Sequence, residues 1–164
     1  REMLLISGRT SDPAGAARAA LGTLADGSAW RKFREFVAAQ GGDLACVDEP
    51  DRLPRAPVIA PLLAAADGTI AQVDAREVGY TVVDLGGGRA RKEDAVDPAV
   101  GVVLAAGTKV GQPAVAGRPL LWVHAGSREA CDAASARLAR AIVISPHPVG
   151  APPLIHKVIR QGAD

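Results

Sequence analysis

A proline-rich, charged stretch at residues 48–57, DEPDRLPRAP, most limits what this chain can fold into. Each of its three prolines removes a backbone N–H donor and fixes φ, so neither a helix interior nor a central strand can run through it. Helical periodicity precedes this linker, whereas short apolar runs separated by turns follow it. We therefore predict a boundary near residue 53, between a helical segment at 1–52 and a different domain at 53–164.

The first predicted helix covers residues 12–25. Ser11 or Asp12 can cap its N-terminus, and Pro13 lies in its first turn, where proline is tolerated. Its apolar side chains recur at helical spacing at Ala14, Ala17, Leu21 and Leu24. The opening REMLLISG reads like the last turns of a helix that starts upstream, so we expect a truncated or processed chain.

A second amphipathic helix is predicted after Gly27, with Ser28 as its N-terminal cap. Trp30, Phe33 and Val37 share one face of it, while the neighbouring charged side chains stay in water. The sequence AAQGGD then predicts a glycine at the C-terminal end of the helix.

After the linker, PVIAPLLAA at 57–65 and TIAQV at 69–73 are typical of short strands. Asp67-Gly68 between them is a strong turn signal, so we expect these two strands to form a hairpin. A helix at about 75–85 follows and tolerates Gly79 at some cost.

Four more apolar runs indicate strands, and one long segment indicates a helix. The helix covers residues 127–141, with Ser127 as its cap and apolar side chains every four positions at Ala130, Ala134, Leu138 and Ile142. The expected strands are VGVVLA, PLLWVHA, AIVIS and the C-terminal PPLIHKVI. The predicted fold class is α+β: a helical N-terminal segment followed by a domain of short mixed strands with flanking helices.

Composition excludes several functions. The 19 basic and 18 acidic residues give a net charge of +1, and aromatic residues are 3% of the chain, so neither nucleic acid nor a membrane is an expected partner. Cys46 and Cys131 have no metal-ligand spacing, which favours reduced thiols in a cytoplasmic protein. His124, His147 and His156 are scattered, and we expect each to have a structural role.

The segment LGGGRARKEDAVD at 85–97 contains the strongest candidate for a binding loop. It does not match a dinucleotide-binding or P-loop fingerprint. Its glycines could turn N–H groups toward an anion, with Arg89, Arg91 and Lys92 completing the site. Alternatively, Gly86 or Gly87 ends the preceding helix, and the cations offset its dipole. We favour the helix end, with Asp94 and Asp97 close enough to pair with the arginines.

Several longer segments together resemble a known family. They are FREFVAAQGGD at 33–43, VGYTVVDLGGGRARKEDAVDPAVGVVL at 78–104, KVGQPAVAGRPLLWVHA at 109–125 and the final PPLIHKVI. In this order and spacing the chain resembles the C-terminal part of the pyrimidine-nucleoside phosphorylase and thymidine phosphorylase family. Ala114 and Trp122 depart from the family pattern, in ways that bear on packing.

The resemblance implies a pentosyltransferase in which phosphate attacks the anomeric carbon of a pyrimidine nucleoside and releases the base. It implies that phosphate and nucleoside bind in the upstream part, so no catalytic, substrate-binding or metal residue and no cofactor is assigned to this chain. The resemblance also implies that this segment alone is inactive. The full-length parent enzyme should be a cytoplasmic homodimer that acts in nucleoside salvage. The glycine loop should then stabilise the C-terminal domain. Replacing Arg89 and Arg91 by Ala in the full-length enzyme should lower its stability more than its turnover.

Two alternatives remain from the sequence. KVGQPAVAGRPLLWV has some character of a biotinyl or lipoyl carrier module, but Lys109 lacks the Met that usually stands beside the modified lysine. A stand-alone interaction module is the second alternative. An upstream reading frame that carries the phosphate-binding part would exclude it.

Overall fold

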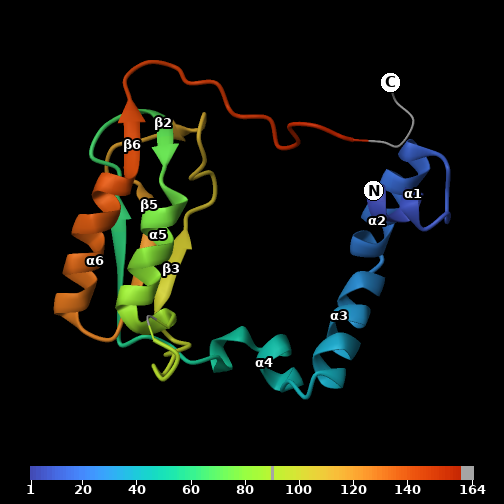
Figure 1. Cartoon of the computed structure of the whole chain (residues 1–164), viewed down its shortest axis with the longest axis horizontal. Helices are drawn as coiled ribbons and strands as arrows, with labels where there is room; N and C mark the ends of the chain where they lie inside the picture. Colours follow the sequence, from blue (N-terminus) through green and yellow to red (C-terminus); the bar gives the residue numbers. More distant parts are fainter. Residues whose placement is uncertain (90, 160–164) are drawn as a thin grey trace. The chain divides into compact units, whose positions relative to one another are not determined.

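The computed structural model describes residues 1–89 and 91–159. The chain divides into two compact units, Arg1–Leu53 and Pro54–Asp164. Figure 1 follows the chain from the helical first unit to the second, which carries the strands.

Unit 1 consists of short helices. They are α1 (Glu2–Ile6), α2 (Pro13–Ala25), α3 (Ser28–Ala39), α4 (Leu44–Asp48) and the 3₁₀ turn η1 (Pro50–Arg52). Asp12 is the cap of α2, because its carboxylate accepts hydrogen bonds from the N–H groups of Ala14 at 2.9 Å and Gly15 at 2.7 Å.

The start of α3 differs from the prediction. Gly27 occupies the N-cap position with a φ of 73°, and Ser28 is the first helical residue rather than the cap. Asp26 accepts a hydrogen bond from the Ser28 N–H at 2.8 Å, so a carboxylate satisfies the donor instead of the serine hydroxyl. The predicted glycine end is confirmed, since Gly41 follows the helix with a φ of 75°.

Unit 2 contains two antiparallel sheets of three strands each. One has the order β1 (Val58–Leu63), β5 (Pro119–Ala125), β3 (Gly101–Leu104). The other has the order β4 (Pro113–Ala114), β2 (Gly68–Val73), β6 (Ile142–Ser145). Both sheets therefore join segments that lie far apart in the sequence.

The predicted hairpin around Asp67-Gly68 is wrong. β1 pairs with β5, where Val58 lies opposite Ala125, whereas β2 pairs with β4 and β6, where Thr69 lies opposite Ser145. The Asp67 carboxylate accepts a hydrogen bond from the Ala116 N–H at 2.8 Å, so the turn passes the chain from one sheet to the other. A Cβ on Gly68 would lie 2.4 Å from the Ser145 carbonyl oxygen, so glycine at this position allows β2 and β6 to approach closely.

Two helices cover the first sheet. α5 (Ala75–Val82) contacts β3, and α6 (Arg128–Ala141) contacts β1 and β5, and Figure 1 shows them side by side. Asp74 caps α5, and Ser127 caps α6 as predicted. Cys131, Ala134, Leu138 and Ala141 are the buried residues of α6. Ile142, expected on this stripe, instead begins β6.

The core of unit 2 is built from small aliphatic side chains between the sheets and the helices. Among its fully buried residues are Ile70, Leu121, Val123 and Leu138. The α+β class with a helical N-terminal segment is confirmed. None of the helices in residues 1–89 and 91–159 is long and apolar enough to span a membrane.

The predicted C-terminal strand is wrong for this chain. Residues 152–159, which the structure describes throughout, contain no strand and are exposed. High β propensity alone does not make a strand, because a strand is stabilised by pairing with a neighbouring edge. None of the sheet pairings in the described residues involves this segment.

Candidate functional site

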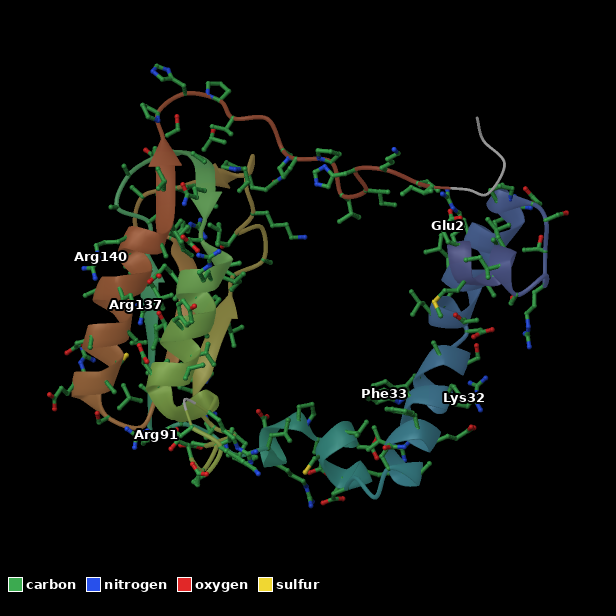
Figure 2. The ribbon with its side chains drawn as sticks, viewed as in Figure 1. Glu2, Lys32, Phe33, Arg91, Arg137 and Arg140 are labelled. Atoms are coloured by element: carbon green, nitrogen blue, oxygen red, sulfur yellow. The ribbon has the colours of Figure 1, made fainter. Side chains whose placement is uncertain are left out.

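A hollow of about 330 Å³ lies between α5 and α6. It is lined by Thr81, Asp84, Leu85, Ala130, Ala133, Ala134, Arg137 and Arg140. The alanines of α6 leave the space because their side chains are short. Figure 2 labels Arg137 and Arg140, which come from the last half of α6.

Arg137 is the centre of a charged cluster that joins the two helices. Its Nε donates to Oε2 of Glu77 at 2.8 Å, and its Nη1 donates to Oδ2 of Asp84 at 2.5 Å. The same guanidinium lies 5.9 Å from the centre of the Tyr80 ring, within range of a cation–π contact. The hydrogen bond to Glu77 raises the pKa of Arg137, with smaller contributions from the charges of Glu77 and Asp84.

Two of the polar groups that line the hollow already have partners. The Thr81 hydroxyl is committed, since it donates to the Glu77 carbonyl oxygen at 2.7 Å, and Arg137 is neutralised by two carboxylates. No histidine or cysteine is among its lining residues. The residues that the structure describes contain no group of three or more His, Cys, Asp or Glu that could hold a metal ion. The hollow is therefore best explained as a helix–helix seam.

The glycine loop has the geometry of a helix end. α5 runs into the π-turn η2 (Val83–Gly87), inside which Gly86 has a φ of 97°. The Gly86 carbonyl oxygen accepts a hydrogen bond from the Asp97 N–H at 2.9 Å, which closes the loop on the helix. A Cβ on Gly87 would lie 2.9 Å from Cγ1 of Val82, so this glycine allows close packing. The favoured interpretation, a glycine that ends the helix, is confirmed for Gly86.

The loop's charged side chains do not converge on one point. Arg89, Arg91 and Lys92 are exposed, and none of them lines the hollow between α5 and α6. Asp94 accepts from the Arg91 N–H at 2.8 Å, and Asp97 accepts from the Ala99 N–H at 2.9 Å. These two carboxylates thus order the backbone of the loop. Figure 2 places Arg91 in this loop, away from Arg137.

The other candidates also lie apart. His124 lies near the end of β5, the middle strand of the first sheet, opposite Ile59 and Gly101. His147 donates its backbone N–H to the Ser145 hydroxyl at 3.0 Å. Lys109 follows the buried Thr108 in the turn between β3 and β4, and its N–H donates to the Gly107 carbonyl at 2.8 Å. Because β3 and β4 belong to different sheets, Lys109 is not at a hairpin tip.

Comparison with known proteins accounts for this architecture. Residues 69–145, from β2 through β6, match the pyrimidine nucleoside phosphorylase C-terminal domain. The chain thus contains the C-terminal domain of the pyrimidine nucleoside phosphorylase family. The resemblance expected from the sequence is confirmed, and the carrier module is not favoured.

Relatives extend the similarity to most of the chain. It is 43% identical over 134 residues to a pyrimidine-nucleoside phosphorylase of Geobacillus stearothermophilus, covering 82% of this chain and 30% of that protein. It is 39% identical over 158 residues to a thymidine phosphorylase of Burkholderia cenocepacia, covering 96% of this chain and 36% of that protein. The chain therefore spans about a third of the length of the relatives it matches.

The cluster around Arg137 was not predicted. Glu77 and Asp84 are seven positions apart on one helical face, but Arg137 follows 60 and 53 positions later. Only the packing of α6 on α5 brings them together. A single sequence offers no local signal for such a contact.

Proposed function

We propose that this chain is the C-terminal part of a pyrimidine-nucleoside phosphorylase, which cleaves pyrimidine nucleosides with phosphate to free base and pentose 1-phosphate. The observation that carries the proposal is the family match across β2 to β6, together with relatives named pyrimidine-nucleoside and thymidine phosphorylase. Inorganic phosphate and a pyrimidine nucleoside are then the substrates of the longer protein. Its cytoplasmic location, homodimer and role in salvage remain predictions.

Within that enzyme the proposed role of this chain is scaffolding. Phosphorolysis needs cations that hold phosphate in line and donors for the charge that develops on the departing base. The cations discussed above do not form such a set: Arg137 is paired with two carboxylates, and Arg89, Arg91 and Lys92 are exposed. This supports a division of labour in which the reacting groups lie upstream and this chain alone is inactive.

The two parts of the chain take different places in this proposal. Residues 1–52 complete the preceding domain, and residues 53–164 form the C-terminal α+β domain. Support comes from burial in unit 1: of residues 1–53, all of which the structure describes, only Ala16 is buried. Large side chains of this unit remain exposed, among them Leu21, Leu24, Trp30, Phe33 and Phe36. Helices of this size do not hold together without burying such a face.

The apolar face of α3 illustrates the point. The Trp30 and Phe33 rings lie 5.7 Å apart, and both remain about half exposed, at 50% and 47%. In Figure 2, Phe33 and Lys32 leave α3 on different sides, as expected for an amphipathic helix. We propose that the preceding domain packs against the face of α3 that carries Trp30 and Phe33.

The proposal is tested by phosphorolysis of uridine and thymidine by the 164-residue chain and by the longer protein that its gene encodes. We expect base release by the longer protein only. A variant of the longer protein with Arg89, Arg91 and Lys92 changed to Ala should keep its turnover. Turnover by the 164-residue chain, or loss of turnover in that variant at unchanged stability, would mean that reacting groups lie in this chain.

A further inference from the structure

The C-terminal residues 152–159 form an apolar segment that this chain leaves uncovered. Leu154 is 97% exposed and Ile159 is 84% exposed, and between them Ile155 and Val158 are also exposed, at 61% and 52%. Four large aliphatic side chains in six residues are far more than a solvated tail needs, because disordered segments are poor in such residues. Such an exposed apolar run marks a contact surface.

The backbone of this segment is free to pair. Among the backbone hydrogen bonds of residues 1–89 and 91–159, none involves residues 152–159. Three of its four aliphatic residues are β-branched, which favours a strand over a helix. Pro152 and Pro153 hold the entry extended, and an isolated helix of this length is marginal in water. An extended chain with free N–H and C=O groups is the form that adds to a sheet edge.

The point where the segment leaves the second sheet of unit 2 is fixed. A Cβ on Gly111 would lie 2.6 Å from the Ala151 backbone nitrogen, and Gly111 itself has a φ of 85°. The Gly111 N–H donates to the Ile70 carbonyl of β2 at 2.8 Å, which ties this contact to the second sheet. From Ala151 onward the eight residues can reach about 26 Å when extended.

The chain itself offers no partner for the segment. Residues 1–53 contain helices and turns but no strand, so unit 1 has no sheet edge, and the segment pairs with none of the strands of unit 2 in the described residues. The relatives are about three times as long as this chain, so most of such a protein lies outside it. A strand tethered to its partner acts at an effective concentration of about a millimolar, which favours pairing within one polypeptide over pairing between copies.

We propose that residues 152–159 add as an edge strand to a β-sheet in the part of the protein that precedes this chain. This rests on the proposed function, in which the chain is the C-terminal part of a longer phosphorylase. The backbone supplies the pairing, and Leu154, Ile155, Val158 and Ile159 fill pockets on the two faces of the sheet. The segment would then fasten the C-terminal domain to the rest of the enzyme.

A paired proline and alanine scan of residues 154–159 in the longer protein tests the proposal. In an edge strand only alternate N–H groups face the partner, so Pro should lower the Tm more than Ala at every second position and equally at the positions between. Lys157→Ala is the control for side-chain loss without loss of apolar contact. A Pro penalty at all six positions indicates a helix and overturns the proposal, as does a penalty at none.

Amide hydrogen exchange on the unmodified proteins gives a second measurement that does not depend on a variant folding. We expect residues 154–159 to exchange at least 100-fold more slowly in the longer protein than in the 164-residue chain. Equal, fast exchange in both proteins overturns the inference, while phosphorolysis by the longer protein would leave the proposed function intact. Protection in the 164-residue chain that grows with concentration indicates pairing between copies and also overturns it.

Discussion

The Nε of Arg137 on α6 lies 2.8 Å from Oε2 of Glu77 on α5, and this ion pair joins the two helices that cover the first sheet of unit 2. Asp84, which lies in the π-turn that follows α5, binds the same guanidinium. One arginine thus connects the end of α5 to α6 immediately before the glycine loop. The cluster around Arg137 therefore has a structural role, which is to join the two helices.

Replacing Arg137 by Ala should destabilise unit 2. The substitution removes two charge-assisted hydrogen bonds and the contact with Tyr80, and it leaves the carboxylates of Glu77 and Asp84 without the cation that both of them bind. We expect the Tm of the chain to fall by a few degrees. Arg128→Ala is the matched control, because it breaks an exposed pair with Asp132 within α6 and should leave the Tm nearly unchanged. Equal effects of the two substitutions would contradict the assignment.

Gly86→Ala tests the helix end. With a φ of 97°, a side chain is strained there even though a Cβ would meet no atom within 4 Å, so the cost is that of the backbone alone. We expect a loss of about 1–2 kcal/mol in the free energy of unfolding, measured by urea denaturation. Gly126→Ala, which also meets no neighbour and has no positive φ, should change it by less than about 0.5 kcal/mol. A neutral Gly86→Ala would mean that the loop adopts another conformation.

Asp26 makes the start of α3 sensitive to acid. The hydrogen bonds from Ser28 hold the pKa of this carboxyl below its usual value of 3.8. Because the folded pKa is lowered, the stabilisation is fully present above about pH 4 and is lost as the pH falls through the folded value. Circular dichroism should show helix loss below pH 4 in the wild type, with a smaller pH dependence in Asp26→Asn. The same acid transition in both proteins would exclude Asp26 as its source.

Tryptophan fluorescence tests whether a preceding domain covers unit 1. Trp30 is half exposed in this chain, so its emission should be red-shifted and easily quenched by acrylamide. In the longer protein the emission should shift to the blue and the quenching should fall. Trp122→Phe isolates this signal, and Trp30→Phe isolates Trp122 on β5, whose emission should be the same in both proteins. An unchanged Trp30 signal would contradict the proposed place of residues 1–52.

The sequence predicted the elements whose causes are local. The helix that begins at Ser127 follows from its cap and from the spacing of Ala134 and Leu138, and the end at Gly86 follows from the only residue that adopts its φ without strain. The α+β class could likewise be predicted from local patterns of apolar residues and turns. The resemblance to the family also rested on residues visible in one chain.

What the sequence could not predict depends on distant partners. Asp67-Gly68 has ordinary hairpin chemistry, yet Val58 pairs 67 positions away with Ala125, because the two apolar runs serve different sheets. Residues 152–159 have the composition of a strand but no partner within the described chain. The ion pairs of Arg137 with Glu77 and Asp84 likewise could not be predicted, because they form only when α6 packs on α5.

The most direct test of the account is phosphorolysis of uridine and thymidine by the 164-residue chain and by the longer protein encoded by its gene, with base release followed at equal concentrations. The account predicts turnover by the longer protein and none by the chain alone. Turnover by the chain, or a longer protein that folds and releases no base, would contradict it.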